Sequence, residues 1–468
     1  MRKSLIPIIS LLFFSFGFSQ ENVPNRYSLQ EAIAFALENN RNAINAQRDI
    51  EAAKKQKWET TASGLPQLNA NVNYQNFLKQ QVSLIPNAAF DNRQGTINTV
   101  EEFFGLQANG SPEPLDGFSE IIFGTKQNIN ATATLNQLIF DGSYIVGLQS
   151  AKVFLEISKN AKIKTDLEVR KNVINAYGNV LLAEESVEIL KRNIAVLEKN
   201  LYETTKIYEN GLGEEESVEQ LQITLSGVKS NLNNTERLNT LAYQMLNIVL
   251  GLDVYNNLVL TDSLETLAEE NQSLVLLESE NNVESTIDYQ IAANDTEAKS
   301  LMVKLEKSKA LPSLSAFLNG GYLGFSNDFT FFDRDQRWAG FSSFGVSLDV
   351  PIFSSGLRSA ATQRAEINFE KAKTELNETE QRIKLQIESA KSEYRFAIED
   401  YENKKENLAL ARRIENKNQT KFFEGIGSSF ELRQAQTQLY TAQQELLQAM
   451  LDVINSKAEL ETLLNTVD

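Results

Sequence analysis

The sequence predicts a mainly α-helical chain that contains four β-strands and is built from two copies of one unit. Three observations lead to this fold class. Landmark sequences recur at a nearly constant offset, which indicates an internal repeat. Long segments carry apolar residues at three- and four-residue spacing, which is typical of coiled-coil helices. Four short segments alternate apolar and polar residues in the way that transmembrane β-strands do.

The internal repeat is visible in three landmarks that each occur twice: a Leu-Pro pair, an Ile-Phe pair and a Gly-x-Gly turn. They lie at 65–66 and 311–312, at 139–140 and 352–353, and at 211–213 and 425–427. The second and third landmarks recur after 213 and 214 positions, but the first recurs after 246. The first copy therefore carries roughly 33 additional residues, and such insertions fall in loops on one face of a repeat protein.

The four strands are expected at about 67–77, 127–140, 313–325 and 338–353. Along them, apolar residues alternate with uncharged polar ones. The polar set comprises Asn69, Asn71, Asn73, Asn128, Asn130, Thr132, Thr134, Ser343 and Ser347. Such strands suit a wall with lipid on one side and a watery lumen on the other, and a half-exposed sheet of a soluble protein is the alternative. Four strands cannot close a barrel, so a membrane barrel would need several chains: two give eight strands and three give twelve.

The helical segments are long and have a narrow apolar seam. Uninterrupted helices are expected over about 143–210 and 356–424, and each would be ~100 Å long. The seam of the first includes Val173, Val180 and Val187, and its phase persists in the second copy. Each helix turns at its Gly-x-Gly, within 208–217 or 423–431, and a second helix returns. The sequence therefore predicts two long coiled-coil hairpins.

Composition excludes several classes of protein. Residues 1–19 have the basic start, short apolar run and small residues of a secretory signal peptide. The absence of Cys and His removes thiol chemistry and the commonest general base and metal ligand, so we expect no enzyme activity, cofactor or metal. A net charge of −17 disfavours nucleic acid as a partner. No later apolar run is long enough for a transmembrane helix, which leaves a soluble exported protein or a β-barrel.

The order of these elements resembles one family. A signal peptide and a first repeat (20–253) precede an inter-repeat segment (254–283), and a second repeat (284–468) follows. Together with the two Leu-Pro pairs, the turn at 208–212 and the segment 425–447, this order resembles the TolC-like outer membrane factors, or outer membrane efflux proteins. That family supplies the exit ducts of tripartite efflux pumps and type I secretion systems.

The resemblance implies a homotrimer in the outer membrane of a Gram-negative bacterium. Three chains would form a 12-stranded transmembrane β-barrel and, below it, an α-helical periplasmic barrel. An N-terminal helix (about 27–61) and the segment 254–283 would contribute to an equatorial region, and 78–125 would be a long extracellular loop. The implied partners are a periplasmic adaptor (membrane fusion protein), an inner-membrane RND, ABC or MFS pump, and outer membrane lipids. The chain itself would be a passive channel with porin activity.

The resemblance also assigns site residues. The adaptor-docking tips would be Gly211, Leu212, Gly213, Gly425, Ile426 and Gly427, although Asn210 stands where the family usually has Val. Glu431 and Gln434 would lie at the periplasmic gate, where the family can carry two acids and this chain has one. Simpler interpretations remain open: the glycines are also typical of hairpin turns, and Glu431 suits the first turn of any helix.

Three other functions fit parts of the sequence. A secreted coiled-coil structural or adhesive protein would need the alternating strands to be soluble. A carboxylate-based periplasmic enzyme would need an acidic pair in a pocket, and no spacing in the sequence supports one. A standalone porin would not need helices ~100 Å long. The sequence does not distinguish drugs, metal ions, siderophores or proteins as cargo.

Overall fold

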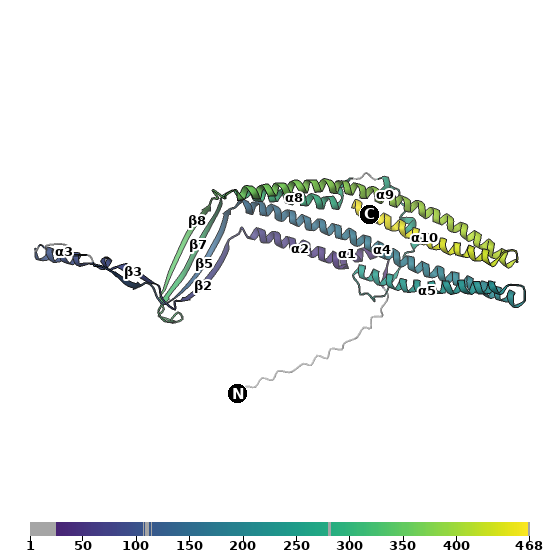
Figure 1. Ribbon diagram of the computed structural model, residues 1–468, viewed down its shortest axis with the longest axis horizontal. Helices are drawn as coiled ribbons and strands as arrows, with labels where there is room; N and C mark the ends of the chain where they lie inside the picture. The colour runs from purple at the N-terminus through teal and green to yellow at the C-terminus, as the bar shows by residue number, and fades with distance from the viewer. Residues whose placement is uncertain (1–24, 106, 108–111, 114, 279–281, 467–468) are drawn as a thin grey trace, which may run out of the picture. The chain divides into compact units, whose positions relative to one another are not determined.

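The computed structural model describes residues 25–105, 107, 112–113, 115–278 and 282–466 (Figure 1). The predicted signal peptide at 1–19 lies outside these residues. The chain divides into two compact units. The helical unit comprises Met1–Lys55, Lys152–Ser300 and Ile367–Asp468, and the sheet unit comprises Gln56–Ala151 and Leu301–Glu366. Within the described ranges, no helix is both long and apolar enough to cross a bilayer.

Two helical hairpins dominate the helical unit. The first joins α4 (Gly142–Glu209) to α5 (Glu215–Leu250), and the second joins α9 (Leu357–Phe423) to α10 (Ser429–Leu464), as Figure 1 shows. The remaining helices are α1 (Leu29–Asn39), α2 (Arg41–Ala62), α6 (Leu264–Glu270), α7 (Val275–Glu278), α8 (Ile287–Ser308) and the 3-10 turn η2 (Val283–Ser285). α4 and α9 have 68 and 67 residues, so the duplicated helices match in length.

The predicted seam of α4 is buried, which confirms the coiled-coil pattern. Val173, Val180 and Leu197 are fully buried. The equivalent positions of α9 include Tyr394 and Tyr401, which are also fully buried. A buried Tyr needs a partner for its hydroxyl, and that of Tyr394 donates to the carbonyl of residue 271 at 2.6 Å. The apolar core therefore extends from the hairpins to the inter-repeat segment.

The N-terminal helix is broken in two rather than continuous over 27–61. Asn40 leaves the helical conformation (ψ 133°), and its side-chain amide donates to the carbonyl of Val249 at 2.7 Å. Close beside this break lies Gly251, with a left-handed φ of +84°, where an added Cβ would lie 2.2 Å from the Asn39 carbonyl oxygen. β1 (Asn25–Tyr27) and β6 (Leu258–Leu260) pair in parallel, which the sequence did not predict. The contacts of Val249 and Gly251 tie this break to the end of the first repeat, and the β1–β6 pairing ties the N-terminal segment to the inter-repeat segment.

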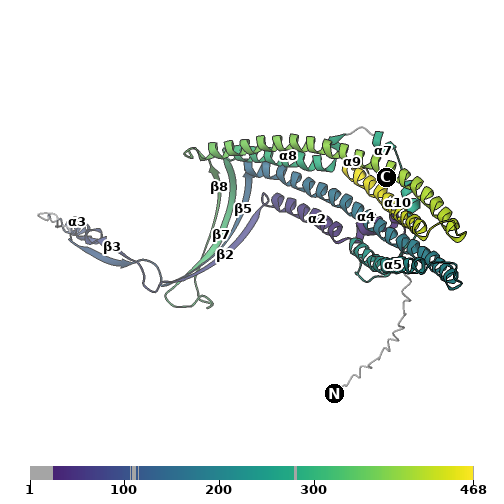
Figure 2. The ribbon, with the colours of Figure 1, turned by 45° about the vertical axis from the view of Figure 1, so that its right-hand side comes forward.

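The sheet unit contains one four-stranded antiparallel sheet. Its strands are β2 (Gln67–Asn76), β5 (Gln127–Phe140), β7 (Ser313–Ser326) and β8 (Trp338–Asp349), in the order β2-β5-β7-β8. Figures 1 and 2 show the four side by side. The fourth strand ends four residues before the predicted boundary at 353, because Pro351 has no N–H for a ladder.

The insertion at 78–125 is not the simple loop that the sequence analysis expected. It contains β3 (Val82–Pro86), the 3-10 turn η1 (Asn87–Phe90), α3 (Arg93–Phe104) and β4 (Phe118–Ile122). β3 and β4 pair as a two-stranded antiparallel sheet of their own. At its root, the Phe77 N–H donates to the Lys126 carbonyl at 2.8 Å, so both ends of the insertion leave the sheet at one place. Figure 2 labels β3 and α3 in this segment.

Candidate conduit wall and hairpin tips

One face of the sheet is rich in uncharged polar side chains. In the register of β2 and β5, Asn69 lies opposite Thr134, Asn71 opposite Thr132 and Asn73 opposite Asn130. The first of these rows continues through Asn319 to Ser343. Since alternate residues of a strand share a face, all nine predicted polar residues lie on this side of the sheet. The larger apolar exceptions on the same face are Leu138, Phe317, Leu323, Phe325 and Phe341.

The opposite face of the sheet is apolar and exposed. Leu68 is 71% exposed, Val72 69% and Phe344 73%. At the end of the sheet near the β7–β8 loop, Tyr74 and Trp338 pack on Phe331, with ring centroids 6.0 and 6.3 Å away. A soluble monomer rarely exposes such a continuous apolar face. The two faces together have the chemistry of a wall between lipid and water.

Both edges of this sheet are open. In the part of the chain that the structure describes, β2 and β8 each pair with one neighbour, so their outer edges have no strand partner. β2 has 10 residues and β8 has 12, and both are exposed along most of their length. Unpaired backbone N–H and C=O groups form a template for pairing with another chain.

The first hairpin tip is a tight turn that exposes one large apolar side chain. Gly211 adopts a left-handed φ of +74°, and the Leu212 N–H donates to the Ile207 carbonyl at 3.0 Å, which closes the end of α4. Leu212 is 82% exposed and Gly213 is also exposed. Asn210, the departure from the family pattern, donates its side-chain amide to the Lys206 carbonyl at 2.6 Å and so caps the helix.

The second tip repeats this geometry. Gly425 has the same φ of +74°, and the N–H groups of Ile426 and Gly427 both donate to the Lys421 carbonyl at 3.0 Å. Ile426 is 73% exposed. Because the two copies share turn conformation and an exposed aliphatic side chain, they present similar surfaces at their tips.

Glu431 has a structural role at the start of α10. The Ser428 N–H donates to the Glu431 carboxylate at 3.2 Å, and the Glu431 N–H donates to the Ser428 hydroxyl at 3.2 Å. This reciprocal arrangement is a capping box, which satisfies two N–H groups that a helix start would leave unpaired. Glu431 and Gln434 are both exposed and lie three positions apart on one face of α10. The capping role is therefore present whether or not the carboxylate also acts at a gate.

A polar layer, which the sequence analysis missed, lies between the two hairpins near their tips. The side chain of Asn193 in α4 donates to Gln443 in α10 at 2.9 Å, and Gln419 in α9 donates to Asn200 in α4 at 3.0 Å. Asn200 is fully buried, and Thr204, Glu415 and Gln436 nearby are also buried. Burial raises the pKa of the Glu415 carboxyl above its ordinary value. A side-chain hydrogen bond from Gln436 opposes this rise in the pKa of Glu415. Within the described residues, the Thr204 hydroxyl has no hydrogen-bond partner.

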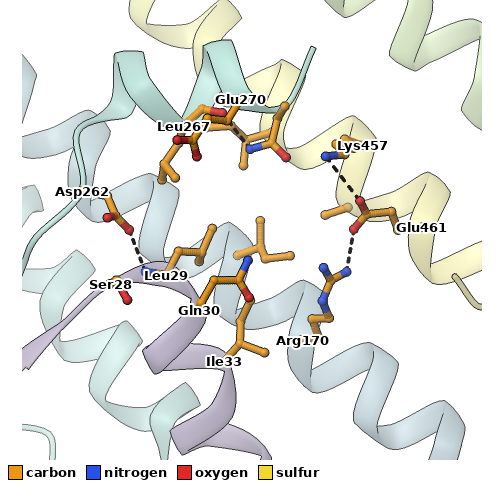
Figure 3. A pocket seen from close by; sticks show the side chains of 14 residues that line it. Ser28, Leu29, Gln30, Ile33, Arg170, Asp262, Leu267, Glu270, Lys457 and Glu461 are labelled. Atoms are coloured by element: carbon orange, nitrogen blue, oxygen red, sulfur yellow. Dashed lines mark hydrogen bonds and ion pairs between the residues drawn. The ribbon is translucent and has the colours of Figure 1, made fainter. Parts of the chain in front are cut away.

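A cavity of about 270 Å³ lies in the helical unit among α1, α4, α6 and α10. In Figure 3, Arg170 and Lys457 point toward Glu461 on one side, and Asp262 lies on the opposite side. Arg170 and Glu461 are 2.6 Å apart with side chains 10% and 8% exposed, and Lys457 lies 3.6 Å from the same carboxylate. The ion pair joins α4 to α10 across the core. Within the described ranges, no group of three or more acidic side chains is placed to hold a metal ion.

Comparison with known proteins finds one family and several similar channels. The family model described as Outer membrane efflux protein matches residues 287–466. Outer membrane protein TolC of Vibrio cholerae is 22% identical over 348 residues, which cover 72% of this chain and 77% of that protein. Residues 287–466, which lie in the second repeat, therefore match the outer membrane efflux protein family. The predicted resemblance to this family is confirmed by this match.

Solved structures of outer membrane channels share this TolC-like fold. CusC has a TM-score of 0.71 at 17% identity, with 93% of this chain and 92% of that chain covered. The CmeC outer membrane channel of Campylobacter jejuni has a TM-score of 0.69 at 16% identity, covering 94% and 85%. VceC of Vibrio cholerae has a TM-score of 0.67 at 16% identity, covering 93% and 95%. Because these likenesses span nearly the whole of each chain, both the helical hairpins and the strands belong to the shared fold.

Proposed function

We propose that this chain is the outer membrane duct of a tripartite efflux pump or a type I secretion system, and that three copies form one tube. The observation that carries the proposal is the sheet with two open edges, one apolar face and one polar face. The family supports it, since its members are outer membrane efflux proteins. The chain would be exported across the inner membrane and would reside in the outer membrane of a Gram-negative cell.

The open edges explain why a single chain cannot form the proposed barrel. In lipid, each unsatisfied backbone group costs several kcal/mol, so only a closed barrel can span the bilayer. An edge as long as β2, with 10 residues, leaves about half of its backbone groups pointing outward. Pairing β2 of one chain with β8 of the next satisfies both edges, and three chains then give a barrel of twelve strands. The Asn, Thr and Ser face would line its lumen.

The helical hairpins form the periplasmic part of the proposed duct, and their tips meet the partners. Leu212 and Ile426 are exposed aliphatic side chains on turns that backbone hydrogen bonds close, and such side chains suit an apolar pocket on a periplasmic adaptor. Glu431 and Gln434 would sit at the periplasmic gate, where three copies of one carboxylate attract cations and repel anions. The duct would be passive, and an inner-membrane RND, ABC or MFS pump would supply the energy.

Cross-linking and conductance measurements test this proposal together. The chain has no Cys, so introduced cysteines are unique. Asn71→Cys in β2 is combined in turn with Phe341→Cys, Ser343→Cys or Gly345→Cys in β8, because the register between neighbouring chains is the unknown. We expect one pair to give a disulfide-linked trimer in detergent, and the purified protein to conduct ions in planar bilayers.

The matched control places the cysteine on an interior strand. Thr132→Cys lies opposite Asn71 on β5 and is one strand further from the neighbouring chain. Combined with the same β8 positions, it should give no covalent trimer. A protein that stays monomeric in detergent, or that forms trimers without conductance, would refute the proposed duct.

A further inference from the structure

The helical unit contains another pocket, at the place where α5 ends and the chain turns toward β6. It has a volume of about 410 Å³ and is formed by side chains from 239–247 and 254–258. This size lies within the range of about 300–1,000 Å³ that is usual for small-molecule sites. Its lining residues are different from those of the cavity around Arg170, so the two are separate sites.

The chemistry of this pocket is uniform, since the described residues that line it are all uncharged. Five of them carry side-chain amides, and we call it the amide pocket: Asn239, Gln244, Asn247, Asn256 and Asn257. Each amide offers both donors and an acceptor. Such a lining offers no counter-charge to an ion, and an apolar occupant would leave the amides without partners. The occupant that fits is therefore neutral and rich in hydrogen-bonding groups.

The walls of the amide pocket are held in place by hydrogen bonds of the chain itself. Asn247 is 1% exposed, and its side-chain amide donates to the carbonyls of Val254 at 3.0 Å and Asn256 at 2.8 Å. The Leu252 N–H donates to the Asn247 carbonyl at 2.8 Å, and the Asn256 N–H donates to the Asp253 carbonyl at 3.0 Å. The loop after α5 is thus fixed before a ligand binds, which lowers the entropic cost of binding.

Some polar atoms of these walls lack a partner within the described residues. They are Oδ1 of Asn239, Oδ1 of Asn247 and Nδ2 of Asn256. Buried polar groups in native proteins are nearly always hydrogen-bonded, so three unpartnered amide atoms around one pocket point to a polar ligand. The terminal torsion of an Asn side chain is broad, so Asn239 and Asn256 can turn an amide toward an occupant of the pocket.

An exposed aromatic ring completes the amide pocket. Tyr255 lines it and is 81% exposed, and the Tyr255 N–H donates to the Asp253 carboxylate at 3.0 Å, which fixes the turn that carries the ring. The face of an aromatic ring carries partial negative charge and attracts C–H groups that neighbouring oxygens polarise. The C–H groups of a pyranose ring are of this kind, and its hydroxyls suit amide side chains. An aromatic ring beside a set of amides is therefore suited to a sugar.

We infer that the amide pocket binds an uncharged sugar that carries N-acetyl groups. The acetamido group is itself an amide, so it can donate to one Asn or Gln side chain and accept from another. Tyr255 would pack on the ring of the sugar, and Gln244 and Asn257 would bind its hydroxyls. A glycan strand of the cell wall and the sugar chain of a lipopolysaccharide can both present such a sugar. The inference needs the export of the chain, which is part of the proposed function, but it does not need three-chain assembly.

Binding of two disaccharides to the purified full chain in detergent tests this inference. Saturation-transfer NMR measures the Kd of N,N′-diacetylchitobiose and of cellobiose, which has the same linkage without the acetamido groups. We expect the first to bind and the second to bind at least about tenfold more weakly. Tyr255→Ala and Gln244→Ala should each weaken binding of diacetylchitobiose about tenfold, since each removes one contact with the sugar. The unfolding midpoint of Tyr255→Ala should equal that of the parent, because this side chain is largely exposed.

The matched control removes an exposed aromatic ring elsewhere in the helical unit. Tyr202 in α4 is 65% exposed, with the Lys206 amine 5.8 Å from its ring centroid. Tyr202→Ala should bind diacetylchitobiose as the parent does. Equal affinity for the two disaccharides, or an equal loss of binding in Tyr202→Ala, would overturn the inference.

Co-sedimentation identifies the source of the sugar. The parent and Tyr255→Ala are mixed separately with cell-wall sacculi and with vesicles that contain lipopolysaccharide. We expect the parent to sediment with one of the two and Tyr255→Ala to stay in the supernatant. If Tyr255→Ala sediments as fully as the parent, the amide pocket is not the binding site.

Conductance in planar bilayers separates this inference from the proposed duct. A chain that forms conducting trimers but does not bind diacetylchitobiose would refute the sugar site and leave the duct standing. A chain that binds the disaccharide but forms no conducting trimer would refute the duct and leave the sugar site standing.

Discussion

The ion pair between Arg170 and Glu461 offers a measurable test of how the core of the helical unit is held together. The two side chains are 2.6 Å apart and about nine-tenths buried, and they connect α4 with the last turn of α10. Glu461→Met would leave the Arg170 guanidinium in the cavity without its acceptor, next to Lys457. Removal of one partner from a buried pair costs 3–5 kcal/mol. The cavity of about 270 Å³ admits water, so we expect the lower end, about 3 kcal/mol.

The assay is a double-mutant cycle on the full chain in detergent. Urea unfolding is followed by far-ultraviolet circular dichroism for the parent, Glu461→Met, Arg170→Met and the double variant. The double variant should be closer to the parent than Glu461→Met is, because no buried guanidinium is left without its acceptor, and Lys457 loses its partner in both of these variants. The coupling energy between the two positions should then be about 2–3 kcal/mol. A coupling energy below about 0.5 kcal/mol would refute the view that each of these two buried charges is stabilised by the other.

Three further predictions follow from single contacts. Gly251→Ala should prevent stable folding of the N-terminal segment, since its Cβ would lie 2.2 Å from the Asn39 carbonyl oxygen at a φ of +84°. Limited proteolysis should then cleave α1 and α2 faster than in the parent. Protease resistance equal to that of the parent would contradict this prediction. Glu431→Gln should keep the capping box with Ser428 but remove the charge. It should therefore leave the unfolding midpoint unchanged and weaken the block of the channel by cations in planar bilayers. If the cation block is unchanged, Glu431 has no role at the gate. Thr204→Val should stabilise the helical unit by about 1 kcal/mol, because it removes a buried hydroxyl that lacks a partner and keeps the shape of the side chain. A loss of stability in urea unfolding would show that the hydroxyl is satisfied after all.

The elements with strong periodicity could be predicted from the sequence. Period-two alternation places the polar residues from Asn69 to Ser347 on one face, and the long heptad-like seam places Val173 and Val180 in the core. Both patterns can be read from the sequence because the direction of a side chain within a strand or a helix follows from its position along the chain, independent of tertiary contacts. The tip glycines were equally clear, because a left-handed turn in a helical hairpin favours Gly strongly.

Features that depend on tertiary contacts escaped the sequence analysis. The break at Asn40 arises because its side chain bonds to Val249 and because Gly251 packs on the neighbouring backbone, and no local pattern encodes either contact. β1 has three residues, too few for a recognisable alternation. The fold of the insertion was missed for a similar reason, since its short strands lie among loop-like Gly, Pro and Asn residues.

The buried polar layer did leave a signal in the sequence. Ser186, Asn193 and Asn200 are spaced seven residues apart in α4, and all three are buried. A polar residue that recurs once per heptad at a buried position favours one register of helix packing over others. The prediction followed only the apolar seam and missed this second stripe, in which each polar residue precedes a seam residue by one position.

The open edges of β2 and β8 have a consequence for genetics. In the three-chain duct proposed here, each chain pairs one edge strand with each of its two neighbours. A chain with a damaged edge strand therefore prevents closure of any barrel that contains it. If a cell makes intact and damaged chains in equal amounts and they mix at random, only about one tube in eight is made of intact chains alone. Edge mutations should therefore be dominant over the normal allele, whereas mutations that prevent the chain from folding at all should be recessive.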